Sequence, residues 1–198
     1  MAALRSSGGS APTAGLVLAA GAGRRFGVPK ALARAADGTP WVQLATEKLL
    51  VGGCAQVTVV LGASALEART LVPADPRVAV VVEPHWTEGM GASLRAGMRW
   101  LEASAPPSVS AAAITLVDLP ELPVAVIRRL LNGVRTTSLR QAVFSGRPGH
   151  PVVVGRQHWP DFLSTLHGDT GGRAYLTQHG VQEVEASDLW SGRDIDVR

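Results

Sequence analysis

Cysteine is almost absent from this 198-residue sequence, which contains only Cys54. A single cysteine excludes an intramolecular disulfide and a zinc site built on several cysteines, and it is typical of proteins from a reducing compartment. Long hydrophobic runs are also missing. The apolar stretches are too short to span a bilayer, and the N-terminus has no apolar segment of signal-peptide length. These absences predict a soluble, cytoplasmic protein in which Cys54 packs in the core.

Charge is sparse and nearly balanced, with 18% charged residues and a net charge of +3. The 19 cationic residues are 17 arginines and 2 lysines. Arginine is well suited to binding phosphate and carboxylate groups, which is one explanation for the excess of arginine over lysine. A genome that favours arginine codons would give the same excess. The 16 acidic residues are spread along the chain. In nucleic-acid-binding proteins, basic residues gather on one face or arm of the molecule. The spread of charge in this sequence argues against nucleic-acid binding.

The pattern of apolar segments predicts one domain over residues 14–198, after a flexible segment at 1–13 that is rich in Ser, Gly and Ala. Strands are expected at 16–20, 56–61, 77–82, 111–117, 141–144, 151–154 and 182–184, and helices at 40–51, 64–71, 91–101, 123–132, 158–166 and 171–178. Apolar strands that alternate with helices indicate an α/β fold, a three-layer α/β/α sandwich with a mostly parallel sheet. Ligands bind such sheets beyond the carboxyl ends of the strands, which selects the loops after Ala20, Val82 and Val117.

The loop after the first strand reads LAAGAGRRFGVPK from Leu18 to Lys30. A glycine-rich turn after a strand exposes backbone N–H groups that can hold phosphates. Its third glycine is one place late for the dinucleotide-binding fingerprint, and no Gly-Lys-Ser/Thr follows as in a Walker A loop. Arg25 and Lys30 add two cations to the same turn, so we expect an anionic ligand here.

The loops after the other two strands carry polar residues. Asp118 directly follows an apolar strand, where a carboxylate suits Mg²⁺ held together with substrate phosphates. The alternative is that Asp118 caps the next turn or helix. Within residues 83–94, Gly89 and Ser93 lead into a helix and can contact a nucleotide, although Ser93 is equally suited to capping the helix.

Two later stretches, 146–152 and 166–173, have the composition of loops on the substrate side. His150 can hydrogen-bond a phosphate there, or it is an ordinary loop histidine. Near the C-terminus, Asp194 and Asp196 can bring a second carboxylate to the metal, or they belong to a solvated tail. No histidine pair with metal-ligand spacing lies beside a carboxylate, so no zinc is expected.

Together these motifs resemble the MobA-like nucleotidyltransferases, and within them the molybdenum cofactor cytidylyltransferases. The resemblance covers nearly the whole chain after the first fifteen residues. It rests on the loop at 18–30, a Trp-x-x-Gly-x-x-x-Ser-Leu stretch at 86–94, Asp-x-Pro at 118–120, Gly-His-Pro-Val at 149–152, Gly-Asp-x-Gly-x-Arg at 168–173 and Asp-Ile-Asp at 194–196. The sequence departs from the family pattern where Leu119 replaces Met and Ala92 replaces Ser.

The resemblance implies a Rossmann-like nucleotide-diphospho-sugar transferase fold and Mg²⁺-dependent transfer of a nucleoside monophosphate to a phosphorylated acceptor, with release of pyrophosphate. Leu-Ala-Ala-Gly, in place of Leu-Ala-Gly-Gly, implies CTP, and the implied acceptor is molybdopterin. The residues implied are Arg25, Lys30 and Asp118 for catalysis; Leu18, Ala19, Ala20, Gly21, Gly23, Arg25, Lys30, Gly89 and Ser93 for the nucleotide; Asp118 and Asp196 for the metal; and His150, Asp169 and Arg173 for the acceptor.

Several alternatives stay open. The acceptor can be a sugar phosphate or another small phosphorylated metabolite. The protein can instead be a nucleotide-binding accessory protein without catalysis, a partner of a molybdoenzyme. The choice between CTP and GTP depends on backbone positions in the loops, so the sequence leaves it open together with the oligomeric state.

Overall fold

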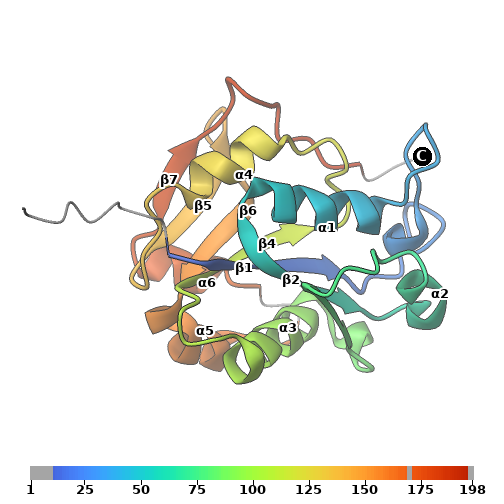
Figure 1. Ribbon diagram of the computed structural model, residues 1–198, viewed down its shortest axis with the longest axis horizontal. Coiled ribbons are helices and arrows are strands. Elements are labelled where there is room, and N and C mark those ends of the chain that lie inside the picture. Colours follow the sequence, from blue (N-terminus) through green and yellow to red (C-terminus); the bar gives the residue numbers. More distant parts are fainter. Residues whose placement is uncertain (1–10, 169–170, 196–198) are drawn as a thin grey trace, which may run out of the picture.

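Seven strands form one sheet in the computed structural model, which describes residues 11–168 and 171–195 (Figure 1). The strands are β1 (Thr13–Ala19), β2 (Cys54–Leu61), β3 (Val78–Val82), β4 (Ala111–Leu116), β5 (Leu139–Phe144), β6 (Arg147–Gly155) and β7 (Gln182–Glu185). Their order is β3-β2-β1-β4-β6-β5-β7. Only β6 runs antiparallel to the other described strands, so the expected mostly parallel sheet is confirmed.

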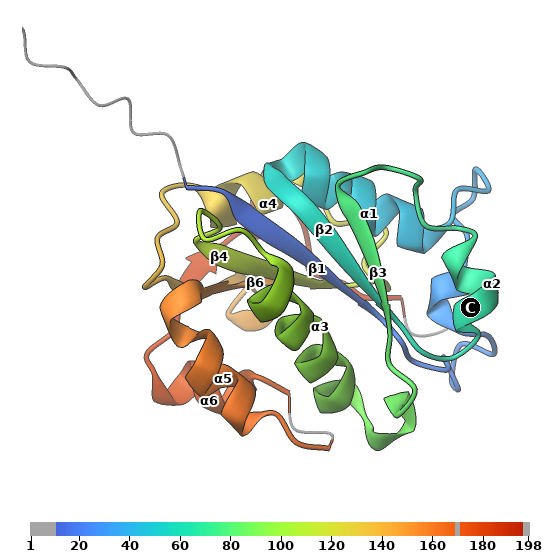
Figure 2. The same ribbon diagram turned by 60° about the horizontal axis from the view of Figure 1, so that its bottom comes forward.

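Helices cover both faces of the sheet (Figures 1 and 2). They are α1 (Trp41–Gly52), α2 (Ala65–Arg69), α3 (Met90–Ser104), α4 (Val124–Leu131), α5 (Trp159–Thr165) and α6 (Arg173–Gln178). Two separate apolar clusters result, one under α1 and α4 and the other under α3, α5 and α6. Among residues 11–168 and 171–195, no helix combines the length and the apolar character needed to cross a membrane.

Strand β1 lies inside the sheet, between β2 and β4, and is buried on both faces. Val17 points into the cluster under α1, while Leu16 and Leu18 point into the cluster under α3. This explains a run of consecutive apolar residues, since a strand with two covered faces has no polar side. Gly97 lets α3 lie close to β1, because a Cβ atom there would come within 2.5 Å of Leu16 Cδ1.

Every expected strand and helix is present, with two differences in bounds that matter here. Strand β1 begins at Thr13, at the end of the segment expected to be flexible, because Thr13 is buried in register with Cys54 and Ala111. Residues 1–10 of that segment lie outside the described part of the chain. The second difference concerns the glycine-rich connection expected between β5 and β6.

That connection is a hairpin turn of only two residues, and the expected substrate-side loop at 146–152 is wrong. Phe144 pairs with Arg147, and both central residues have positive φ, 52° for Ser145 and 75° for Gly146. These angles are those of the tight turns that match the twist of paired strands. Strand β6 therefore begins at Arg147 and includes His150.

Candidate nucleotide-binding site

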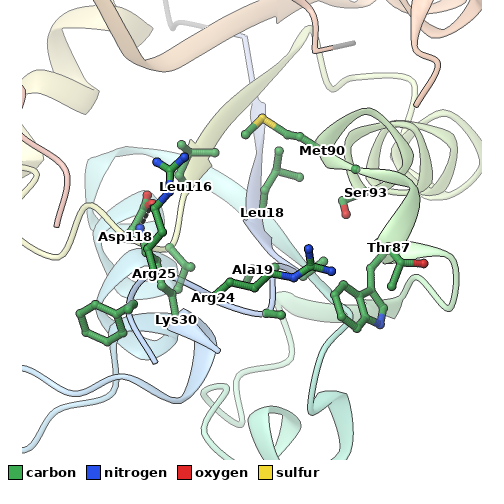
Figure 3. Close-up of a pocket in the computed structure, with 18 residues that line it drawn as sticks. Leu18, Ala19, Arg24, Arg25, Lys30, Thr87, Met90, Ser93, Leu116 and Asp118 are labelled. Carbon is green, nitrogen blue, oxygen red and sulfur yellow. Dashed lines mark hydrogen bonds and ion pairs between the residues drawn. The ribbon is translucent and has the colours of Figure 1, made fainter. Parts of the chain in front are cut away.

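A pocket of about 540 Å³ opens at the carboxyl ends of β1 and β4 (Figure 3). All three loops expected to surround a ligand line it. The lining residues are Leu18, Ala19, Ala20, Gly21, Ala22, Gly23, Arg24, Arg25, Phe26, Lys30, Trp86, Thr87, Gly89, Met90, Ser93, Leu116, Val117 and Asp118. The pocket lies where the strand order reverses between β1 and β4, as ligand sites do in open parallel sheets.

The glycine-rich loop is folded by its own backbone. The Gly23 carbonyl accepts hydrogen bonds from the amides of Phe26 (2.9 Å) and Gly27 (2.8 Å). Gly23 has φ of 61°, and a Cβ atom on it would lie 1.9 Å from the Val28 carbonyl oxygen. Only glycine fits this conformation. The buried Phe26 ring packs against Trp41 of α1 at 5.1 Å between centroids, which fixes the loop to the core.

Lys30 and Asp118, 88 residues apart, form an ion pair at the pocket wall. Lys30 Nζ lies 2.8 Å from Asp118 Oδ2, and the two side chains are only 15% and 16% exposed. The other carboxylate oxygen, Asp118 Oδ1, is buried and has no hydrogen-bond partner among residues 11–168 and 171–195. Asp118 does not cap the following helix, because the N-cap of α4 is Pro123. The alternative that Asp118 caps this helix is therefore wrong.

The unpartnered oxygen of Asp118 fits a hard divalent cation. Within the described ranges, no group of three or more His, Cys, Asp or Glu residues could hold a metal by itself. Mg²⁺ does not need one, since it binds through one or two carboxylates with substrate phosphates and water. The site thus suits a metal that arrives with a phosphorylated ligand.

Two adjacent arginines serve different sides of the pocket. Figure 3 shows Arg25 extending to the side that holds Asp118 and Leu116, and Arg24 extending to the side that holds Thr87. Both side chains are exposed. With Lys30, they give the pocket three cations and make it suitable for a polyanion.

The third wall comes from the loop after β3 and the start of α3. Ser93 is 5% exposed and lies one turn inside α3, whose N-cap is Gly89, so the interpretation of Ser93 as a cap is wrong. Trp86 was not among the expected site residues. A Cβ atom on Gly62 would lie 2.6 Å from both Trp86 Cβ and the Ala20 carbonyl oxygen. Gly62 directly follows β2. A glycine at the end of a strand was the one feature of the sequence that could have indicated the close approach of Trp86.

Two of the expected acceptor residues, His150 and Arg173, do not line this pocket. His150 lies on β6 with Nδ1 3.3 Å from the Ile114 carbonyl, so Nδ1 carries the proton that it donates. Burial lowers the His150 pKa, against the opposing charge of Asp118. Arg173 is the exposed first residue of α6, and neither residue lines the pocket.

Two further expected site residues, Asp169 and Asp196, lie outside the described residues. The segment before Asp196 does reach the site, because the Ile195 amide donates to the Asp118 carbonyl (3.2 Å). Cys54 is buried in the core as expected, and burial raises its pKa to about 12.

A family model and a known relative each match most of the chain. The model of the MobA-like NTP transferase domain matches residues 15–184. A protein from Paenarthrobacter nicotinovorans named nicotine blue oxidoreductase is 37% identical over 193 residues, covering 92% of this chain and 91% of that protein.

Solved structures agree on the fold. Rv0371c from Mycobacterium tuberculosis H37Rv matches with a TM-score of 0.78 and 27% identity, over 96% of this chain and 95% of that chain. Molybdopterin-guanine dinucleotide biosynthesis protein A from Archaeoglobus fulgidus matches with a TM-score of 0.64 and 16% identity, over 93% of each chain. The fold is thus the expected Rossmann-like one of nucleotide-sugar transferases. The chain belongs to the MobA-like NTP transferase family and is an enzyme of the nucleotidyltransferase kind.

Proposed function

We propose that this protein transfers CMP from CTP to molybdopterin and releases pyrophosphate. The observation that carries the nucleotidyl transfer is the Lys30–Asp118 pair in a pocket bordered by the glycine-rich loop. A cation and a carboxylate with one unpartnered oxygen are the two groups needed to hold a triphosphate and its metal side by side. The proposal of CTP and molybdopterin rests on the motifs at 18–30, 149–152 and 168–173.

The reaction is a displacement at phosphorus. An oxygen of the acceptor phosphate attacks the α-phosphorus, the bond to the bridging oxygen of the β-phosphate breaks, and pyrophosphate leaves with the electron pair. An anionic phosphate is already a nucleophile, so catalysis consists of positioning and charge neutralisation. Loop amides with Arg25 and Lys30 hold the β- and γ-phosphates and neutralise the charge of the leaving pyrophosphate.

The remaining residues bind and orient. Leu18 to Ala20 and Gly89 border the base and ribose, and the buried Ser93 hydroxyl offers a hydrogen bond from α3. Asp118 would hold Mg²⁺, with Asp196 as a second ligand, and the bound ion supplies Lewis-acid polarisation of the phosphate oxygens. A solved structure of Rv0371c, 25% identical over 88% of this chain with a TM-score of 0.70, is described as a complex with manganese. His150, Asp169 and Arg173 remain our candidates for the acceptor side.

Thermal unfolding with CTP, GTP, UTP and ATP, each with and without Mg²⁺, tests the nucleotide. A ligand at a hundredfold excess over its Kd stabilises by about 2.7 kcal/mol. For a chain of this size the midpoint then rises by about 5–10 °C. We expect a Mg²⁺-dependent rise with CTP alone, and a rise with another nucleotide would reassign the donor.

Pyrophosphate release tests the acceptor. We expect release with CTP and molybdopterin and none with a panel of sugar phosphates. Release with a sugar phosphate alone would support the alternative acceptor class. Nucleotide binding without release from any acceptor would support a non-catalytic accessory protein.

A second candidate function, oxidoreduction, is favoured by the relative named nicotine blue oxidoreductase, which is 37% identical over nearly both full lengths. A pocket that holds a triphosphate can also hold the diphosphate of a reduced nicotinamide dinucleotide. The nicotinamide would pass a hydride to a small acceptor and leave oxidised. A test for oxidoreduction distinguishes it from nucleotidyl transfer. The protein preparation used for the pyrophosphate assay is mixed with reduced nicotinamide dinucleotide and a redox dye, and the loss of nicotinamide absorbance is followed. Dye-dependent oxidation of the reduced nicotinamide dinucleotide without pyrophosphate release would contradict the transferase proposal and support oxidoreduction.

A further inference from the structure

The two edge strands of the sheet differ sharply in their chemistry. Strand β7 reads Gln-Glu-Val-Glu, and charges on an edge discourage pairing with another chain. Strand β3 at the other edge reads Val-Ala-Val-Val-Val and is only half-buried, with Val82 48% exposed. It contains no charge, proline or bulge that would block a further strand. Figure 2 shows β3 beside β2 at the edge of the sheet. An edge of this kind is suited to pairing.

The backbone of β3 presents a regular row of hydrogen-bonding groups outward. The Arg77 carbonyl accepts from the Val57 amide, and the Glu83 amide donates to the Leu61 carbonyl. The backbone N–H and C=O groups of the odd-numbered residues of β3 therefore point toward β2. Those of Val78, Val80 and Val82 point away from β2, toward the open edge. The Val78 amide donates to the Asp75 carbonyl. In the described part of the chain, nothing bonds the outward groups of Val80 and Val82.

The charges that flank β3 are complementary to themselves in one register. A twofold axis at Val80 would pair two copies of β3 antiparallel, and Val80 would exchange two hydrogen bonds with Val80 of the second copy. Val82 would lie opposite Val78 of the second copy and donate to its carbonyl, since the Val78 amide already donates to Asp75. In that register Arg77 lies opposite Glu83 of the second copy, in the type of pair whose side chains approach most closely. Arg77 uses Nε and Nη2 on Asp75, which leaves Nη1 for Glu83 of the second copy.

We propose that β3 is the interface of a homodimer, in which two copies of this chain join their sheets antiparallel about Val80. The outward backbone parity allows this register, and the Arg77–Glu83 match selects it among the registers that the parity allows. A peptide of another protein could use the backbone edge but would gain nothing from a charge pattern that is symmetric about Val80. The two pockets would open at opposite ends of the paired strands, because the carboxyl ends of the two β3 strands point in opposite directions.

Light scattering across a micromolar dilution series tests the dimer. We expect a mass of twice 20.6 kDa that falls on dilution. Arg77→Glu and Glu83→Arg should each weaken association by about tenfold or more, since each puts like charges opposite one another twice. The combined variant should recover association, because the charges are exchanged and again opposite. Arg135→Glu, which makes the same charge change on an exposed residue far from β3, should leave the mass unchanged.

Two results would overturn the proposed dimer. A wild-type mass of 20.6 kDa throughout the series overturns it. So does a combined variant that stays monomeric while its thermal midpoint and its nucleotide-induced shift match those of the wild type. These results would not affect the proposed transferase, whose pocket residues are unchanged.

Cysteine cross-linking tests the register. Opposite hydrogen-bonded residues have Cα atoms about 5.5 Å apart, within disulfide range. Val80→Cys should therefore cross-link under mild oxidation. Val78→Cys is the matched control on the same strand, because its two copies would lie about 13 Å apart along the strands. The native Cys54 is buried and does not interfere. Equal cross-linking of both variants would exclude a twofold axis at Val80.

Discussion

At the scale of single residues, the proposed function gives the Lys30–Asp118 pair two successive roles, one without a ligand and one with it. Without a ligand, attraction to the ammonium group of Lys30 offsets the hydration that the mostly buried Asp118 carboxylate has lost. In the proposed function, an entering triphosphate would give Lys30 an alternative anionic partner and make Asp118 available to a cation. Metal and nucleotide binding are then thermodynamically linked.

Manganese binding to two variants tests this linkage. The wild type should bind Mn²⁺ weakly alone and more tightly with nucleotide, as followed by electron paramagnetic resonance. Lys30→Met should raise the affinity for Mn²⁺ alone, since it removes the competing cation, and should lower turnover by about 10²–10³-fold. Asp118→Asn should abolish nucleotide-dependent Mn²⁺ binding. Unchanged Mn²⁺ binding in Lys30→Met would contradict the competition.

The Cys54 thiol offers a probe of the core. Burial raises its pKa to about 12, so almost no thiolate is present near pH 8. The folded protein should therefore not react with Ellman's reagent at that pH, and one thiol should react in denaturant. Fast reaction of the native protein would mean that the start of β2 opens locally.

At the scale of elements, the glycine-rich loop is fixed by one glycine more than by the others. Gly23→Ala should abolish nucleotide binding, because a side chain at φ 61° costs about 1–2 kcal/mol and its Cβ would overlap the Val28 carbonyl. Gly133→Ala is the matched control, since Gly133 has a similar φ of 67°, nothing lies within 4 Å of its Cβ position, and it does not line the pocket. The nucleotide-induced rise in thermal midpoint measures both variants. Equal loss in the two would show that the Gly23 turn is not what holds the loop in its binding conformation.

The sequence predicted elements and loops better than contacts between them. Strands and helices follow from local apolar patterns, and the three loops follow from the rule that ligands bind at carboxyl ends of strands. The Lys30–Asp118 contact and the approach of Trp86 to Gly62 were not predicted, because they join segments far apart in the chain. The loop expected around His150 was wrong because Ser145, although not a glycine, adopts positive φ and closes a hairpin.

At the scale of the whole molecule, the sheet has two parts that meet between β4 and β6. Strands β3, β2, β1 and β4 form a continuous parallel part, and β6 joins it antiparallel. His150 stands at this junction, donating to the Ile114 carbonyl of β4. The folded chain disfavours protonation of the His150 ring, because burial lowers its pKa from the ordinary value of 6.5 more than the hydrogen bond to Ile114 and the charge of Asp118 raise it.

The lowered pKa of His150 makes stability depend on pH. As pH falls below 6.5, the unfolded chain takes up a proton at His150 that the folded chain accepts only at lower pH. The unfolded state then binds more protons, so the free energy of unfolding should decrease from pH 6.5 toward pH 5 and be independent of this group above pH 7. Urea unfolding across this range measures the slope. His150→Asn should flatten the slope even if it lowers stability at every pH, because asparagine does not titrate. An unchanged slope in His150→Asn would mean that other groups cause the dependence, and that the junction between β4 and β6 is not sensitive to acid.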